Sequence, residues 1–318
     1  GLIHVKSGKI EGGYIYSWDI GNFGTIDLSD ATFGKPSETD ITDMAFIQIV
    51  EEAAGISLTR NAVGTVSLTE KNLETMASVM ALNIAEKGLT GLSALKYFTG
   101  LQTLNCSGNS LTTLDVSALT NLTSLNCYRN ELTKLDVSKL TNLTSLDCSF
   151  NSLTTLDVSA LTKLTSLDCY RNELTTLDVS ALTKLTSLYC YRNELTKLDV
   201  SKLTGLTKLD CAYNQLTALD VSNLTGLEDL DCAKNLLTEL NIMNLTLLMD
   251  LDCSENRMSS LDISKFLYLY SVKCGKQTAD GVTSRTLTLT LTAAQKARGV
   301  FNASSKYNVD VNLNVVGQ

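Results

Sequence analysis

Hydrophobic positions recur with a fixed period of 21 residues through the middle of the chain. In the unit Leu143–Lys163 (LTSLDCSFNSLTTLDVSALTK), Leu146 and Cys148 flank the polar Asp147. This alternation predicts a short β-strand with one buried face, because successive side chains of a strand point to opposite faces. Further apolar positions follow at less regular spacing: Leu153, Leu156, Val158 and Leu161. We expect each unit to form a strand and a return path that line one apolar interior.

The nine cysteines all occupy one position of this repeat: Cys106, Cys127, Cys148, Cys169, Cys190, Cys211, Cys232, Cys253 and Cys274. Disulfide frameworks and zinc sites use short, uneven spacings, whereas an unbroken period marks a repeat. Neighbouring cysteines of the stack would lie ~4.8 Å apart with parallel Cβ directions, which does not suit a disulfide. We therefore predict a ladder of buried, inert thiols that fill a tight apolar position.

Aligning the chain on its cysteines divides it into three regions. Eight 21-residue units span 101–268, a 22-residue unit precedes them at 79–100, and a partial unit follows at 269–277. One unit is too small to bury a core, so the units have to stack into a solenoid whose ends need caps. The predicted regions are an N-terminal region 1–78, repeats 79–277 and a C-terminal cap 278–318.

Two polar positions are the same in nearly every unit. An asparagine follows each strand, where a buried Asn can satisfy backbone groups of a bend that the sheet does not reach. These residues are Asn109, Asn130, Asn151, Asn172, Asn193, Asn214, Asn235 and Asn256. An aspartate with a serine two residues later is predicted to close the convex turn through side-chain-to-backbone hydrogen bonds. A carboxylate ladder for cations is the less favoured alternative. These aspartates are Asp115, Asp136, Asp157, Asp178, Asp199, Asp220 and Asp262.

The repeat resembles that of a known family. The pattern L-x-x-L-x-C-x-x-N-x-L, present as Leu122, Leu125, Cys127, Asn130 and Leu132, resembles the leucine-rich repeat. The unit length and the second half L-T-x-L-D-V-S-x-L-T are most similar to internalin-type surface proteins of bacteria. The resemblance implies an α/β-type repeat solenoid. It would be right-handed, with a parallel concave β-sheet, short 3-10 or extended convex segments, a small helical N-terminal cap and a β-rich C-terminal cap.

Aromatic and arginine side chains collect at variable positions beside the central strands. We call them the Tyr/Arg row: Tyr128, Arg129, Phe150, Tyr170, Arg171, Tyr189, Tyr191, Arg192 and Tyr213. Tyr and Arg are enriched among residues that carry binding energy, so a row on the concave face predicts a ligand-binding surface. The alternative is that Tyr-Arg pairs were copied with the repeats and cover neighbouring strands by cation–π contact.

The same surface becomes acidic toward the C-terminal units. The residues are Asp229, Asp231, Asp250, Asp252 and Glu255. We interpret this patch as a solvated face, and a basic partner or a cation is the alternative.

The N-terminal region is not repetitive. Residues 1–36 contain β-branched and aromatic runs that predict irregular strands: Leu2–Lys6, Tyr14–Trp18 and Thr25–Leu28. A helix–loop–helix cap is predicted over 37–78. Asp40 or Thr42 would cap its first helix, and Ser67 and Glu70 would form a capping box for its second helix.

The segment Thr59–Glu70 (TRNAVGTVSLTE) resembles the calcium loop of an EF-hand. Asn61 and Glu70 occupy ligand positions, but Thr59 and Val63 stand where ligands are needed. Lost carboxylates lower calcium affinity. We therefore predict a cap that has lost its metal.

Past Cys274 the repeat ends, and Gln277 replaces the ladder asparagine. Thr286–Thr292 and Asn308–Val316 alternate as strands, and Thr292–Ala297 is predicted to be a short helix. We expect a hairpin-like element that covers the open edge of the last repeat.

Charge and composition narrow the function. The net charge of −8 and a pI near 4.8 exclude nucleic acid as a partner, since phosphate binding needs a basic surface. No apolar run is long enough for a membrane span. The chain has one histidine, His4, and contains no phosphate loop, GxSxG motif or metal-ligand cluster. We expect no enzyme activity, no cofactor and no metal.

Two functions stay open. The first is a non-enzymatic module that recognises a protein or glycan on the concave sheet. The second is a structural or self-associating surface spacer without a dedicated ligand. The resemblance implies a secreted or cell-surface bacterial protein. Because the chain carries no signal peptide, we expect a removed N-terminal segment if the protein is exported or anchored.

Overall fold

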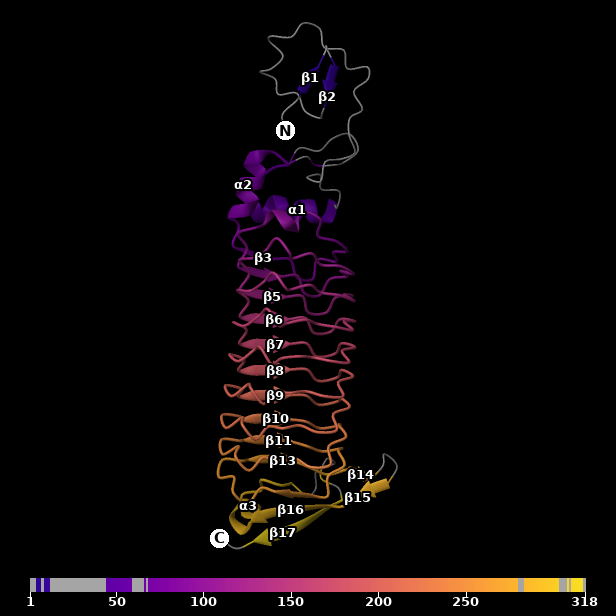
Figure 1. The fold of residues 1–318 in the computed structure, drawn as a ribbon, viewed down its shortest axis with the longest axis vertical. Helices are drawn as coiled ribbons and strands as arrows, with labels where there is room; N and C mark the ends of the chain where they lie inside the picture. Colours follow the sequence, from indigo (N-terminus) through magenta and orange to yellow (C-terminus); the bar gives the residue numbers. More distant parts are fainter. Residues whose placement is uncertain are drawn as a thin grey trace.

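A ten-stranded parallel sheet runs along one side of the molecule (Figure 1). The computed structural model describes residues 4–6, 9–11, 44–58, 66, 68–279, 283–302, 308 and 310–316. The strands are β3 (Ala81–Asn83), β4 (Thr103–Asn105), β5 (Ser124–Asn126), β6 (Ser145–Asp147), β7 (Ser166–Asp168), β8 (Ser187–Tyr189), β9 (Lys208–Asp210), β10 (Asp229–Asp231), β11 (Asp250–Asp252) and β13 (Ser271–Lys273). Each pairs in register with the strand of the next unit, so that Leu125, Leu146 and Leu167 are neighbours. This is the predicted leucine-rich-repeat solenoid.

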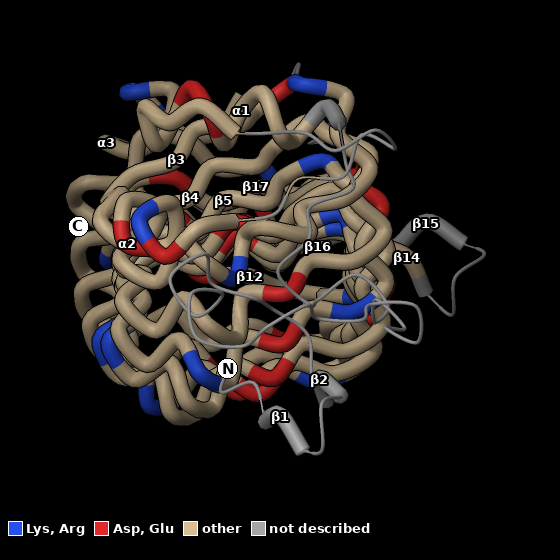
Figure 2. Tube along the Cα trace, turned by 90° about the horizontal axis from the view of Figure 1, so that it is seen from above, with Lys and Arg blue, Asp and Glu red and all other residues tan. Residues whose placement is uncertain are grey.

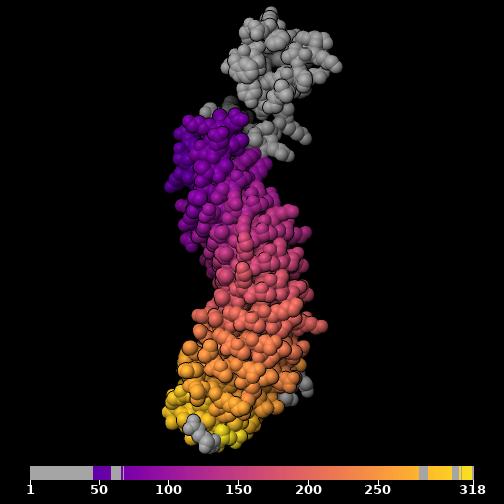
Figure 3. Space-filling model, turned by 60° about the vertical axis from the view of Figure 1, so that its left-hand side comes forward, coloured from indigo at the N-terminus to yellow at the C-terminus, as the bar shows by residue number. Residues whose placement is uncertain are grey.

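The core is one continuous apolar cluster along the whole stack. The strand leucines and the return-path residues point into it, and the interior thus runs through every unit. Return paths are tight turns, in which Leu119 N–H donates to Val116 O at 2.9 Å and Leu122 N–H donates to Leu119 O at 3.0 Å. The turns lie above one another along the axis (Figure 2), and the described residues form an elongated rod (Figure 3).

The predicted asparagine ladder is confirmed. From Asn130 to Asn256 the amide nitrogen donates to the carbonyl oxygens of two successive cysteines, and the amide oxygen accepts a backbone N–H of the preceding unit, as in Asn193. Asn109, at the start of the ladder, donates to Ile84 O and Cys106 O. Gln277 makes the same set of bonds, to Cys253 O, Cys274 O and Met258 N–H, so its longer side chain continues the ladder. The ladder ties each turn to its neighbour where the sheet hydrogen bonds end.

The predicted Asp-Ser turn is also confirmed. Asp157 Oδ1 accepts the N–H of Ser159 at 3.0 Å and its hydroxyl at 2.6 Å. Hydrogen bonds from the serine hydroxyl and N–H lower the pKa of Asp157, because they favour the ionised carboxylate. These carboxylates therefore accept hydrogen bonds from their own turns.

All nine cysteines are free and buried. Burial in the apolar interior raises the pKa of each thiol, to about 12 for Cys106, because the thiolate is poorly solvated there. Because the strands before them pair in register, the cysteines of neighbouring units follow adjacent strands of the sheet.

We expect the native protein to be inert toward a thiol reagent such as dithionitrobenzoate. A buried thiol with a raised pKa offers neither access nor thiolate. Absorbance should report no released product from the native chain and reaction of all nine cysteines in urea. Substantial reaction of the native chain would contradict the buried ladder.

Two short helices lie at the N-terminal end of the stack (Figure 1). They are α1 (Met44–Ala54) and α2 (Glu70–Ser78), and Phe46, Ile47 and Met76 join the common core. The predicted capping box of Ser67 and Glu70 is wrong. Thr69 is the N-cap and pairs with Asn72, because α2 begins at Glu70 and the third helical position is therefore Asn72.

Other N-terminal predictions fall largely outside the described residues. β1 (His4–Lys6) pairs antiparallel with β2 (Lys9–Glu11), which agrees with a strand in the first predicted run. The runs Tyr14–Trp18 and Thr25–Leu28, the caps Asp40 and Thr42, and most of the loop Thr59–Glu70 lie outside the described part.

The C-terminal end differs from the predicted hairpin. β16 (Leu287–Thr292) pairs in parallel with β17 (Val311–Val316) and with β12 (Ser260–Asp262), and α3 (Ala293–Ala297) follows β16. The connection through α3 returns the chain in the same direction, so the two strands cannot be antiparallel. β14 (Gln277–Ala279) and β15 (Thr283–Arg285) form the antiparallel pair.

The edge of β13 is covered by the segment after α3. Val272 N–H donates to Val300 O at 3.0 Å, and Asn308 Oδ1 accepts the N–H of Cys274 at 3.0 Å. The last strand of the long sheet is thus closed by irregular backbone and one asparagine side chain. The predicted protection of this edge is confirmed, although the covering element differs.

Candidate functional site

The structure places the Tyr/Arg row mostly at the rim of the sheet. Only Tyr189 lies within a strand, β8. Tyr128, Tyr170 and Tyr191 follow two residues after the ends of β5, β7 and β8. Arg129, Phe150, Arg171, Arg192 and Tyr213 follow three residues after the ends of β5 to β9. The row therefore borders the concave face at the carboxyl ends of the strands.

Four rings of the row form a continuous series of contacts. The ring centroids of Tyr128 and Phe150 are 5.2 Å apart, and those of Phe150 and Tyr170 are 5.5 Å apart, both edge to face. Tyr170 and Tyr191 stack with centroids 4.4 Å apart and planes inclined by 10°. The rings remain partly exposed, and together they give a preformed aromatic surface across four units.

Cationic groups lie against these rings. The Arg171 guanidinium is 4.5 Å from the Phe150 centroid, and that of Arg192 is 4.4 Å from the Tyr213 centroid. Lys234 approaches the same Tyr213 ring at 4.4 Å and was not among the predicted residues. Its 21-residue spacing from Tyr213 was the signal that could have found it.

The backbone under the row is in the left-handed region. φ is 53° at Arg129, 52° at Phe150, 52° at Arg171, 54° at Arg192 and 55° at Tyr213. Non-glycine residues hold this conformation only where their surroundings enforce it. Here the N–H of Arg171 donates to Tyr191 O and that of Arg192 donates to Ala212 O, both at 2.9 Å. Hydrogen bonds between stacked turns thus fix the backbone that carries these side chains.

Burial keeps the phenols of Tyr170 and Tyr191 neutral. Burial, and then the Tyr170 ring, raise the pKa of Tyr191 to about 12, and burial also raises the pKa of Tyr170. Burial also raises the pKa of Asp168, the last residue of β7, to about 6. The row can therefore offer phenol and guanidinium donors together with aromatic faces.

Tyr189 belongs to a different part of the face, a shallow depression of about 330 Å³ over β8 to β13. We call it the acidic depression; its polar and aromatic lining is Tyr189, Lys208, Asp210, Asp229, Asp231, Asp250, Asp252, Tyr270 and Lys273. Ion pairs join Lys208 to Asp229 at 3.5 Å and Lys273 to Asp252 at 3.3 Å. Burial raises the pKa of Asp210 to about 6 and that of Asp231 to about 7.

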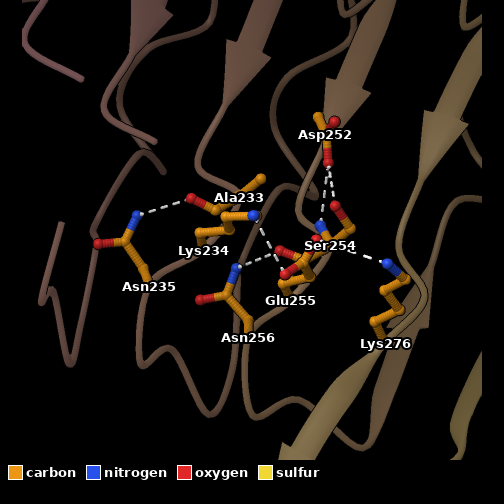
Figure 4. A network of polar contacts seen from close by, with 8 residues as sticks. All are labelled: Ala233, Lys234, Asn235, Asp252, Ser254, Glu255, Asn256 and Lys276. Atoms are coloured by element: carbon orange, nitrogen blue, oxygen red, sulfur yellow. Dashed lines mark hydrogen bonds and ion pairs between the residues drawn. The ribbon is translucent and has the colours of Figure 1, made fainter. Parts of the chain in front are cut away.

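Charges on the neighbouring rim are balanced instead. Figure 4 shows Glu255 between Lys234 and Lys276, with Nζ–Oε distances of 3.4 and 3.9 Å. The predicted acidic patch therefore separates into a paired glutamate on the rim and aspartates on the strands. Within the described ranges, no group of three or more His, Cys, Asp or Glu side chains is arranged to hold a metal ion.

Comparisons with known proteins agree with this architecture. The sequence profile "Leucine Rich repeats (2 copies)" matches residues 99–139 and 141–182. No curated protein matches the chain. Among the helices of the described part, none is long and apolar enough to cross a membrane.

Solved structures of bacterial repeat proteins are similar to the whole array. The functional domain of InlJ from Listeria monocytogenes, which includes a cysteine ladder, is 33% identical with a TM-score of 0.63. The match covers 86% of this chain and 59% of that chain. The internalin InlF of the same organism is 22% identical over 86% of this chain and 90% of that chain, with a TM-score of 0.55. A leucine-rich-repeat protein of Leptospira interrogans is 22% identical over 79% of this chain and 69% of that chain, with a TM-score of 0.59.

Proposed function

The chain is a leucine-rich-repeat protein of the internalin type, and from this premise we propose that it is a non-enzymatic recognition module. Its ligand, a protein or a glycan, binds the Tyr/Arg row on the concave side of the sheet. The role is that of a bacterial surface or secreted protein. The likeness to the InlJ domain supports this assignment, although this chain spans only 59% of the length of that structure.

One observation carries the proposal. The four-ring series from Tyr128 to Tyr191 is partly exposed, and it lies on a backbone that the stacked repeat turns hold rigid. Rigid aromatic surface binds at low entropic cost, because few rotamers are lost on contact. Neutral phenols and guanidinium groups add hydrogen-bond donors to the same surface. Such a surface fits a flat protein face or the apolar face of sugar rings.

The cation–π contacts favour a second interpretation of the same residues. Arg171 and Arg192 lie over rings of adjacent turns, so part of the row could serve only to cover the stack. In a spacer of this kind, removal of the row would lower the stability of the stack and would leave ligand binding unchanged. The two functions are therefore separable in one variant.

The test is the variant Tyr170→Ala/Tyr191→Ala/Arg192→Ala, assayed against animal-cell surface extracts and a glycan array. We expect binding to fall at least about tenfold, as for residues at the centre of an interface. The matched control is Lys139→Ala/Lys184→Ala/Lys202→Ala, which removes three exposed lysines away from the row. Circular dichroism checks the fold of both variants. Unchanged binding by a folded triple variant of the row would refute the proposal.

A further inference from the structure

The last two complete units and the partial unit 269–277 carry exposed apolar side chains at positions where earlier units are polar or small. Met249 and Tyr270 occupy the position that is threonine in five earlier units, for example Thr186 and Thr207. Leu247 and Tyr268 occupy the position held by Lys184 and Gly205. Tyr268 and Tyr270 are 60% and 62% exposed, so neither side chain is part of the core.

This change removes a hydrogen bond between turns. In earlier turns the threonine hydroxyl donates to the threonine carbonyl of the preceding unit, as Thr207 does to Thr186 at 3.1 Å. Met249 and Tyr270 keep the backbone bond between their turns, with Tyr270 N–H donating to Met249 O at 2.9 Å. They cannot make the hydroxyl bond of the threonines, and their side chains remain in solvent. Stability of the stack therefore does not explain the substitution.

The exposed apolar edge is continuous with the acidic depression, because Tyr270 lines it. The depression holds five aspartates and two lysines, and each lysine is paired to a different aspartate. Among the described residues, the ion pairs of this surface involve Asp229 and Asp252, whereas Asp210, Asp231 and Asp250 are in none of them; Lys273 acts on Asp231 and Asp250 only from beyond ion-pair distance. A surface with uncompensated carboxylates beside exposed apolar groups complements a cationic, apolar ligand.

We propose that this end of the concave face is a second docking surface, which takes a segment of a partner protein with Lys or Arg beside apolar residues. The cationic groups lie over Asp210, Asp231 and Asp250, and the apolar groups contact Met249 and Tyr270. This surface is distinct from the Tyr/Arg row, apart from Tyr189 at its border.

Docking at this surface depends on pH. Asp210 pairs across the sheet with Tyr189 and Asp231, and Asp231 also pairs with Asp252. The other charged and phenolic groups of the depression are Lys208, Asp229, Asp250, Tyr270 and Lys273. Burial raises the pKa of Asp210 to about 6 and that of Asp231 to about 7, so both carboxylates bind protons in mildly acid solution. A cationic ligand needs the ionised forms. Affinity is therefore full above the pKa of Asp231 and falls on the order of tenfold between about pH 8 and about pH 5.5.

The test selects random peptides displayed on phage against the whole chain at about pH 8. Selected peptides should carry Lys or Arg beside apolar residues, and their affinity should fall at least about tenfold at about pH 5.5. It should fall similarly for Asp210→Asn/Asp231→Asn and for Met249→Thr/Tyr270→Thr, which restores the threonines of the earlier turns. Circular dichroism confirms that these variants fold.

The variant Tyr170→Ala/Tyr191→Ala/Arg192→Ala should bind the same peptides unchanged, which separates this surface from the Tyr/Arg row. Selected peptides without cationic residues would overturn the proposal, and so would binding by either surface variant that is as tight as binding by the wild type. So would a wild-type dimer that Met249→Thr/Tyr270→Thr abolishes, because a second copy would then occupy the surface.

Discussion

Replacement of Asn193 with alanine should lower the free energy of unfolding by about 3–5 kcal/mol. Asn193 Nδ2 donates to Cys169 O and Cys190 O, and its Oδ1 accepts the N–H of Leu174, all at 3.0 Å. The side chain is only 8% exposed, so water cannot replace these bonds without entering the turn. Each buried backbone group left without a partner costs about 1–3 kcal/mol. Urea denaturation followed by circular dichroism measures the loss.

Asn142→Ala is the matched control. Asn142 donates one bond, to Thr120 O at 3.0 Å, and accepts one from Lys163 Nζ at 2.7 Å, and both bonds are exposed to solvent. Its loss should change the free energy of unfolding by less than about 1 kcal/mol. Equal losses in the two variants would show that the asparagine ladder does not hold the turns together.

Gly100→Ala should destabilise the junction between the N-terminal cap and the repeats by about 3 kcal/mol. A Cβ atom at Gly100 would collide with the carbonyl oxygen of Ala77, near the end of α2. That oxygen belongs to backbone, so the clash can be relieved only by moving α2 away from the first repeat. Hydrogen exchange should then be faster in α1 and α2 than in β6 to β10.

Gly205 and Gly226 provide the controls, because they occupy the repeat position of Gly100. A Cβ atom would lie 3.7 Å from Leu185 O at Gly205 and 3.9 Å from Leu206 O at Gly226, which is ordinary contact. Alanine there should be neutral or stabilising by about 0.4–1 kcal/mol. A Gly100→Ala variant as stable as Gly205→Ala would contradict the close docking of α2.

The repeats could be predicted from the sequence because every turn has the same neighbours. Once Cys127, Cys148 and Cys169 fix the register, period-2 alternation decides which strand residues are buried. The asparagine and Asp-Ser positions could be predicted for the same reason, since each bonds within its own turn or to the preceding one. Only a substitution such as Gln277, with no counterpart elsewhere, needed the structure.

The caps could not be predicted in this way. Parallel pairing of β16 with β17 is a long-range contact, and alternation in Thr286–Thr292 is the same for either strand direction. The start of the helix at Glu70 depends on which residue is the N-cap, and the sequence offers two candidates two positions apart, Ser67 and Thr69.

The residues of the candidate site could be named from the sequence, but their positions in the fold could be predicted only in part. Alternation ends with the third strand residue, and the left-handed turn that follows carries Phe150 and Arg192 to the rim. Spacing alone does not report that rotation. The acidic depression was visible as charges in the sequence, whereas its volume and its apolar border at Tyr270 required the fold.

The central claim is that a ligand contacts the Tyr/Arg row. Site-specific photo-crosslinking tests it most directly, with benzoylphenylalanine in place of Tyr191 or, as a control, of the exposed Lys184 at the end of the preceding unit. The account predicts a crosslinked ligand from position 191 and none from position 184 when the protein is incubated with animal-cell surface extract. Equal crosslinking at the two positions, or crosslinking only at position 184, would contradict it.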